Sequence, residues 1–162
     1  MELVKKRLAN MLATNPSRID YYKRYTQIIE EYNADQDYAT IEKTFLDLMN
    51  LAKNMTDEEQ RYVREGFSSD EELSIYDLLF SENLSKEDII KIKKVAIDLL
   101  QKIKDKISNM DHWTEKQETR ASVDNIIRDV LFAEIPDCMF DRIDDYRKSV
   151  YEHVFTHFKQ AA

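Results

Sequence analysis

Apolar side chains recur at spacings of three and four residues along most of the chain, and no segment alternates with a period of two. Because an α-helix has about 3.6 residues per turn, this spacing gathers the apolar residues on one face of each helix. The pattern predicts an all-α fold of six to eight helices. The apolar faces that we expect to be buried are Tyr25, Ile28, Ile29 and Tyr32; Ile41, Phe45, Leu48 and Ala52; Leu73, Tyr76 and Phe80; Ile89, Ile92, Ala96, Leu99 and Ile103; Val123, Ile126, Ile127 and Val130; and Tyr146, Val150, Val154 and Phe158.

Hydroxyl residues three positions ahead of an acid or an amide mark the expected starts of helices, because the hydroxyl can accept an unpaired backbone N–H. Trp113, the single tryptophan, would lie just before one such cap and pack back on the first turn, so we interpret it as structural. Gly66 suits the left-handed position after a helix, and Pro136 suits the start of the last one. The expected capping pairs are Ser17–Asp20, Thr56–Glu59, Ser69–Glu72, Ser85–Asp88 and Thr114–Gln117.

The length of 162 residues fits a single helical domain over residues 1–162. An alternative assigns residues 1–14 to a linker helix from a preceding domain. One glycine in the whole chain excludes the glycine-rich loops of nucleotide sites, so no bound cofactor is expected. One cysteine forms no internal disulfide and fits a reducing compartment. No apolar run approaches the roughly 20 residues of a membrane helix, so we expect no membrane contact.

Few residues are candidates for catalysis or metal binding. His153 and His157 are four apart and could share a metal, but no third ligand is evident, so we expect no metal site. Acidic clusters at residues 57–59 and 70–72 are expected in the first turns of helices. Cys138 is expected to be a small buried residue. The sequence therefore predicts no catalytic site.

The net charge of −8 argues against a surface that binds nucleic acid as a whole, although residues 86–106 hold seven lysines and four acids. Two interpretations stay open for this segment. The lysines could form a solvated face with pairs such as Lys94–Asp98 and Asp98–Lys102, or they could contact DNA phosphates. The candidate DNA-contacting residues are Lys91, Lys93, Lys94, Lys102, Lys104 and Lys106.

Three segments combine into a more specific pattern. NPSRIDYYKRYTQIIEEYN, at 15–33, contains an arginine and ends its helix with a Tyr-Asn pair. MTDEEQRYVREGFSSDEELSIYDLL, at 55–79, contains a Glu-Glu-x-Arg helix, a glycine stop and a Glu-Glu-Leu-x-x-x-Asp-x-Leu helix. MDHWTEKQETRASVDNIIRDVLF, at 110–132, places an aromatic start and an Arg-Ala pair before an apolar helix. Together these segments resemble the C-terminal region of the restriction (motor) subunit of type I restriction-modification enzymes.

The resemblance implies a role in assembly. In that family the nuclease and the ATP-driven, Mg-dependent DNA translocase lie upstream, so the chain would be the C-terminal domain separated from them, with no cofactor of its own and with Met1 as an artificial start. Its expected partners are the methyltransferase and specificity subunits, with double-stranded DNA as a further possibility, in the cytoplasm of a bacterium or archaeon. The alternative is a domain that mainly binds DNA through the lysines of residues 91–106.

The docking surface of such an assembly domain should have an apolar or aromatic centre and a polar rim. We expect the tyrosine-rich helix at 21–32 or the last helix to supply it. Arg120 could pair with an acid inside the domain, or reach a carboxylate or phosphate of a partner. The candidate partner-binding residues are Arg120, Tyr21 and Tyr25.

Overall fold

Eight α-helices and three short 3-10 helices make up the part of the chain that the computed structural model describes, residues 1–158, and that part contains no strand. The predicted all-α fold is therefore confirmed. The helices are α1 (Glu2–Thr14), α2 (Ile19–Ala34), α3 (Tyr38–Glu59), α4 (Arg61–Arg64), α5 (Asp70–Leu79), α6 (Lys86–Ile107), α7 (Gln117–Glu134) and α8 (Ile143–His157), with 3-10 helices η1 (Pro16–Arg18), η2 (Trp113–Glu115) and η3 (Asp137–Arg142).

The chain divides into two units, Met1–Asp70 and Glu71–Ala162. The prediction of a single domain over the whole chain stays a prediction. Helix α1 belongs to the first unit, because its Leu8 and Met11 are buried in that unit's core.

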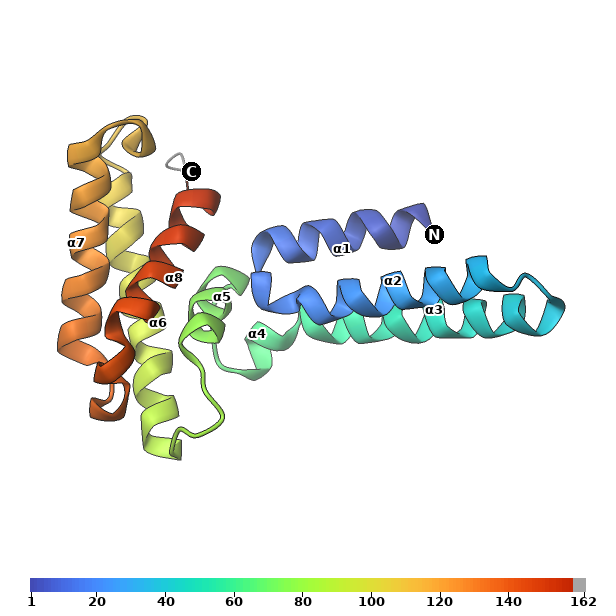
Figure 1. The fold of residues 1–162 in the computed structure, drawn as a ribbon. Coiled ribbons are helices and arrows are strands. Elements are labelled where there is room, and N and C mark those ends of the chain that lie inside the picture. Colours follow the sequence, from blue (N-terminus) through green and yellow to red (C-terminus); the bar gives the residue numbers. More distant parts are fainter. Residues whose placement is uncertain (159–162) are drawn as a thin grey trace. The chain divides into compact units, whose positions relative to one another are not determined.

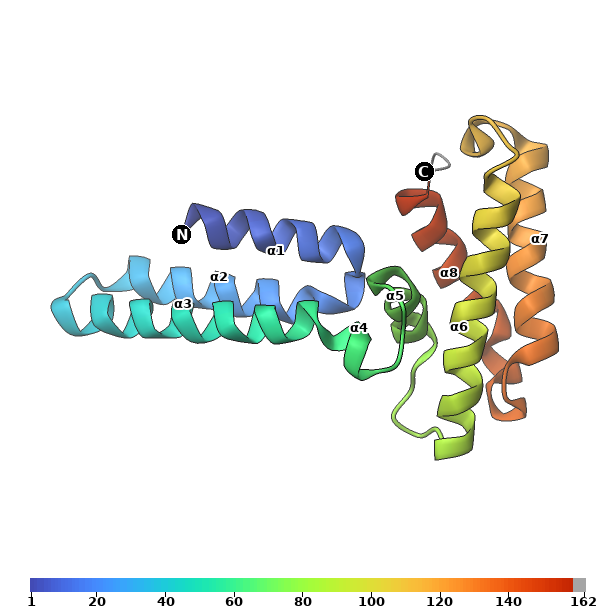
Figure 2. The same ribbon diagram turned by 180° about the vertical axis from the view of Figure 1, so that it is seen from behind.

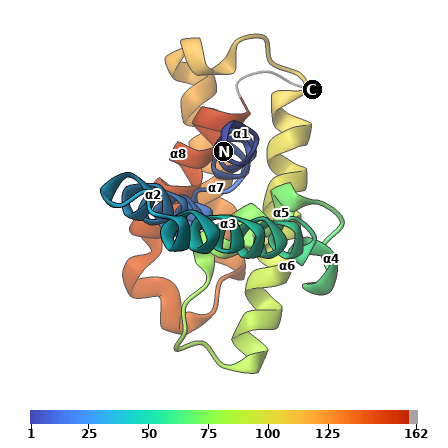
Figure 3. The same cartoon turned by 90° about the vertical axis from the view of Figure 1, so that its right-hand side faces the viewer.

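In the first unit, α2 and α3 lie side by side as a long antiparallel hairpin, and α1 runs along it (Figure 1). Figure 3, which looks nearly along α1, places this helix over the α2–α3 pair. The three helices bury one apolar cluster, which consists of Leu8, Met11, Tyr25, Ile28, Leu51 and Met55.

Short polar side chains set the turns of the first unit. Asn15 Oδ1 accepts a hydrogen bond from the Ser17 backbone N–H at 3.1 Å, and Pro16 follows it at the first position of η1. Asp37 Oδ1 accepts from the Thr40 N–H at 2.7 Å and caps α3. These caps fix where the hairpin begins and where it reverses.

In the second unit, α6 packs against α7, and α7 packs against α8 (Figure 2). Ser85 caps α6 as predicted, because its Oγ accepts from the Asp88 N–H at 3.1 Å. Acids in the first turn of α6 and lysines in the last turn complement the helix dipole. The fully buried apolar side chains of the three helices include Ile92, Ala96, Leu99, Ile103, Val123, Ile127, Leu131, Val150 and Val154.

Three predicted caps are wrong. Asn15 takes the capping position expected for Ser17, and α2 starts at Ile19. Thr56 lies inside α3 and donates to the Ala52 carbonyl, so the acids at 57–59 lie in that helix's last turn. Helix α7 begins at Gln117 after Lys116, and Thr114 is part of η2. Pro136 precedes η3, and α8 begins later, at Ile143.

Gly66 ends α4 in the left-handed conformation that its position predicted, with φ at +86°. The Gly66 N–H donates to the Val63 carbonyl and the Phe67 N–H donates to the Tyr62 carbonyl, which is the double hydrogen bond of a Schellman motif. A side chain at this position would meet no atom within 4 Å, so the requirement for glycine comes from the backbone angle alone.

Candidate functional site

An exposed apolar stripe runs along α3, and we call its five residues the α3 stripe. Their exposed fractions range from 46 to 83%. The prediction that Ile41 and Phe45 face the core is wrong, because α3 buries a neighbouring face that carries Leu51 and Met55. The α3 stripe consists of Tyr38, Ile41, Phe45, Leu46 and Met49.

The spacing of the α3 stripe makes it continuous. Tyr38, Ile41, Phe45 and Met49 follow each other at intervals of three, four and four residues. Residues at these intervals are neighbours on one side of a helix, so the four side chains form a line. An apolar line of this length in contact with water is a feature of surfaces that bind another macromolecule.

Carboxylates surround the end of the hairpin that carries the stripe. Five acids and no lysine or arginine lie between Glu30 and Glu42. Two of the five have roles within the unit, since Asp37 caps α3 and Glu31 pairs with Lys43 at 3.2 Å. Glu42 lies three residues before Phe45, on the same side of α3 and beside the stripe.

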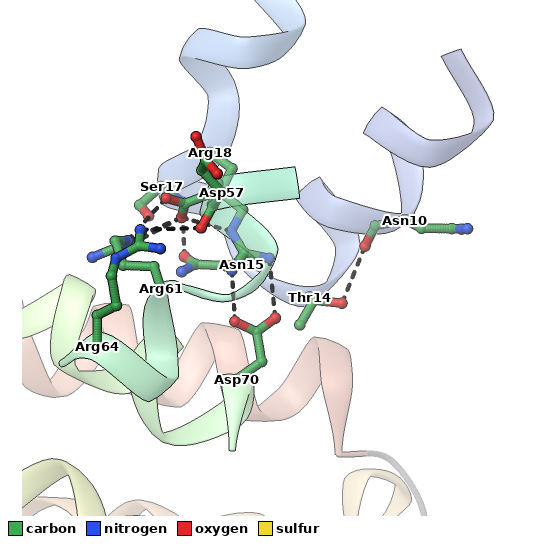
Figure 4. A network of polar contacts seen from close by, with 10 residues as sticks. Asn10, Thr14, Asn15, Ser17, Arg18, Asp57, Arg61, Arg64 and Asp70 are labelled. Carbon is green, nitrogen blue, oxygen red and sulfur yellow. Dashed lines mark hydrogen bonds and ion pairs between the residues drawn. The ribbon is translucent and has the colours of Figure 1, made fainter. Parts of the chain in front are cut away.

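A buried arginine fastens the base of the hairpin. Arg18 is only 3% exposed. Its Nε donates to Glu58 Oε1 at 3.0 Å, and its Nη1 and Nη2 donate to the two carboxylate oxygens of Asp70 at 3.0 and 2.6 Å. Figure 4 shows the paired bonds to Asp70 and the neighbouring Asn15 and Arg61. The guanidinium therefore ties the start of α2 to the last turn of α3 and to Asp70.

Further arginines complete this network at the end of α3. Arg61 Nε donates to Glu58 Oε2 at 2.9 Å, and Arg7 donates to both oxygens of Glu59 at 2.8 and 3.0 Å. Desolvation by itself would lower the pKa of Arg18, but the hydrogen bonds to Asp70 and Glu58 raise it above its ordinary value. Every charge in the network has a partner of opposite sign, which is the condition for burying charges. Local sequence patterns could not predict this network, because Glu58 and Asp70 are 40 and 52 residues from Arg18.

The six candidate lysines of α6 do not lie on one face. Lys91, Lys94, Lys102 and Lys106 share one side of the helix by their spacing. Lys93 and Lys104 lie on the other side, where the Lys93 Nζ stands 5.6 Å from the centre of the Tyr76 ring and the Lys104 Nζ pairs with Glu71 at 3.1 Å.

Acidic side chains lie close to the larger of the two lysine groups, which consists of Lys91, Lys94, Lys102 and Lys106. Burial, and then a hydrogen bond with Asp98, raise the pKa of Glu134, while nearby Lys94 and Lys102 oppose the rise. A hollow on this side of the unit is lined by Lys102, Asp105, Lys106, Asn109 and Ile126. Mixed charge of this kind weakens the attraction for phosphate.

The family comparison covers almost the whole chain. The profile described as "Type I restriction enzyme HindI endonuclease subunit-like, C-terminal" matches residues 1–160. The chain belongs to this family, which comprises C-terminal domains of type I restriction endonuclease subunits. The match extends beyond the three segments between residues 15 and 132 that carry the resemblance in the sequence. Comparison with curated proteins and with solved structures finds no match.

Trp113 is fully buried in the second unit of this type I restriction enzyme domain. Its Nε1–H donates to the Phe158 carbonyl, and its ring meets Tyr151 and Phe155 edge to face at 6.4 and 6.0 Å. Arg120 Nη1 donates to the Thr114 carbonyl at 3.1 Å and so holds the η2 turn against α7. The polar run after Trp113 is thus the turn and the first part of α7.

The tyrosines predicted to bind a partner lie in or against the core of the first unit. Tyr25 is 8% exposed within the apolar cluster, and Tyr21 is partly buried against it. Burial, followed by the charge of Glu58, raises the pKa of Tyr21. The exposed apolar residues of this restriction enzyme domain lie on α3 instead, and a role for Tyr21 or Tyr25 in partner binding stays a prediction.

No group of three or more metal-ligating side chains occurs among residues 1–158. Cys138 is exposed, which corrects the expectation of a buried thiol, and its Sγ lies 3.5 Å from Asp88 Oδ2. Partial desolvation by neighbouring atoms, and then the hydrogen bond with Asp88, raise the pKa of that thiol, so its reactive thiolate form is disfavoured. None of the described helices is long and apolar enough to span a bilayer.

His153 is buried, at 6% exposed, and its ring centre lies 4.5 Å from that of His157. Desolvation, and then the charge of His157, lower the pKa of His153 to about 4. The Nδ1 atom of His153 is buried without a hydrogen-bond partner among the described residues. The buried imidazole is therefore neutral at ordinary pH.

Acidification should destabilise the second unit through this histidine. Because the pKa is lower in the folded state than its ordinary value of about 6.5, the unfolded chain binds more protons between about pH 6.5 and 4. We expect His153 to contribute a loss of roughly 3 kcal/mol of unfolding free energy across that window. Denaturant unfolding of the native chain and of His153→Gln at several pH values measures it as the difference between their pH slopes. Equal slopes would contradict the prediction.

Proposed function

We propose that the chain is a non-catalytic assembly module, which docks the endonuclease and translocase subunit of a type I restriction enzyme onto its methyltransferase–specificity core. In this proposal the cleavage of DNA and the use of ATP and Mg belong to other parts of the subunit. The observation that carries the proposal is the α3 stripe, an apolar line exposed to water on a well-anchored hairpin.

The stripe fits a protein partner better than it fits DNA. Burial of apolar area provides a driving force for protein association that salt does not screen. DNA offers a negatively charged backbone, and the carboxylates around the stripe repel it. The network around Arg18 supports the proposal by holding α2 and α3 at the base of the hairpin, since a rigid surface loses less entropy on binding.

Direct DNA contact is a second candidate function. Lys91, Lys94, Lys102 and Lys106 share one side of α6, and two of them line the surface hollow. This group could add phosphate contacts once the protein surface has docked. We rank it second because Asp98, Asp105 and Glu134 lie among these lysines.

A competition assay tests the proposal. The 162-residue chain is titrated into the methyltransferase–specificity core bound to its DNA, and the joining of the full endonuclease subunit is measured at about 0.1 and about 1 M salt. We expect competition at both concentrations, because apolar contacts persist when charges are screened. A variant with Lys91, Lys94, Lys102 and Lys106 replaced by Glu should compete equally well.

Two results would contradict the assembly role. Competition that vanishes at high salt, together with binding of the chain to free DNA that the lysine variant loses, would favour the DNA-binding alternative. Absence of competition at both salt concentrations would leave the family membership intact and remove the proposed docking role.

A further inference from the structure

We infer that the α3 stripe receives an amphipathic helix of the partner protein, and that this helix carries basic residues beside its apolar face. The inference rests on the proposed docking function and names the kind of segment that would occupy the surface.

The intervals between the residues of the α3 stripe are those at which a partner helix can present its own apolar side chains. The line from Tyr38 to Met49 covers twelve residues, whose eleven steps along the axis span about 16 Å or three turns of helix. A partner helix that presents apolar residues at intervals of three and four positions would place one side chain against each of these turns. Phe45 lies in the middle of the line and is 63% exposed, so it can serve as the central aromatic anchor.

The negative charges at this end of the hairpin favour a partner segment of positive charge. Asp37 and Glu31 are engaged in a cap and an ion pair, but Glu30, Asp35 and Glu42 also have exposed side chains. Glu42 flanks Phe45 on the helix surface. A helix with lysine or arginine along its edges would be attracted here, and an acidic helix would be repelled.

Photo-crosslinking in the assembled enzyme identifies the occupant. A photoreactive phenylalanine analogue replaces Phe45 in the full endonuclease subunit, the complex is formed on DNA, and the captured peptide is sequenced by mass spectrometry. We expect the label to attach to a partner segment with helical apolar spacing and with lysine or arginine beside it. Capture of DNA, of an acidic segment or of a non-helical one would overturn the inference.

Matched substitutions measure the energetic role of the stripe. Phe45→Glu should weaken binding to the core by about thirtyfold or more, as expected for a central anchor. Phe132→Glu is the control, because Phe132 has the same side chain in the second unit and is 64% exposed, compared with 63% for Phe45. Circular dichroism should show both variants folded, since both sites are on the surface.

A charge reversal separates the inference from the proposal on which it rests. Glu42→Lys should slow association with the core, most strongly at low salt, because it replaces an attractive charge beside Phe45. If the core binds normally to Phe45→Glu and no crosslink forms at Phe45, docking uses another surface and only the inference fails. If the chain does not compete with the full subunit for the core, the proposed function fails, and the inference that rests on it fails as well.

Discussion

Replacement of Arg18 by alanine should lower the free energy of unfolding of the first unit by about 3–5 kcal/mol. The substitution removes the two hydrogen bonds that Arg18 donates to the carboxylate of Asp70, and it removes a guanidinium partner of Glu58, which is 8% exposed and also pairs with Arg61. Removing one member of a buried ion-pair network costs more than the pair contributed by being present, because the remaining charges stay desolvated with fewer hydrogen bonds. Lysine should not restore the loss, because a single ammonium cannot reproduce the planar fork that binds both carboxylates.

Arg24 provides the matched control for this prediction. It lies on α2 close to Arg18, but its nearest carboxylate is 3.7 Å away and its side chain is 44% exposed. Its replacement by alanine should change the stability by no more than about 1 kcal/mol. Hydrogen exchange of the amides in α2 and α3 measures both variants locally. Equal protection in the Arg18 and Arg24 variants would show that the buried network contributes no more than an exposed pair.

The local rules of helix formation predicted much of the secondary structure. The spacing of apolar residues located the helices, the Ser85 cap formed as expected, and Gly66 took the left-handed conformation. The Thr56 cap failed because α3 continues through that residue, and the Ser17 cap failed because several residues near a helix start can satisfy the same backbone groups. Asn15 does so in place of Ser17.

The candidate site was less predictable because it depends on which helix faces are covered. Helix α3 carries apolar residues over a wide arc, from Leu51 and Met55 to Ile41 and Phe45. Periodicity shows that both faces are apolar, but only the packing of α1 and α2 decides which one is buried. The width of the apolar arc was the one signal in the sequence that α3 has more apolar surface than its own unit covers.

The sequence also did not show that the lysines of α6 lie on two sides of the helix. A count of charges over residues 86–106 treats the segment as one patch, although a helix distributes its side chains around an axis. Lys93 and Lys104 therefore lie on a different side from Lys91 and Lys102, with Tyr76 and Glu71 beside them. Glu134 lies 36 residues after Asp98 in the sequence, so the sequence alone could not indicate that the two carboxylates approach each other.

Replacement of Trp113 by alanine should destabilise the second unit by about 3–5 kcal/mol, the range expected for removal of a large aromatic side chain from a core. The loss has three sources: the cavity left by a fully buried indole, the edge-to-face contacts with Tyr151 and Phe155, and the hydrogen bond to the Phe158 carbonyl. Trp113→Phe keeps most of the apolar volume and removes the N–H donor. It should therefore retain a substantial part of the stability.

Circular dichroism in denaturant is the suitable measurement, because each substitution also removes the single tryptophan that fluorescence would report. Comparison with Phe155→Ala separates the indole's own packing from that of its half-buried neighbour, and Phe155→Ala should cost less. If Trp113→Ala left the unfolding midpoint unchanged, the indole would not be packing as the geometry indicates. At temperatures where the Trp113 variants stay folded, docking should be unaffected, because the α3 stripe belongs to the other unit. A docking defect in folded Trp113→Phe would instead place part of the partner surface on the second unit.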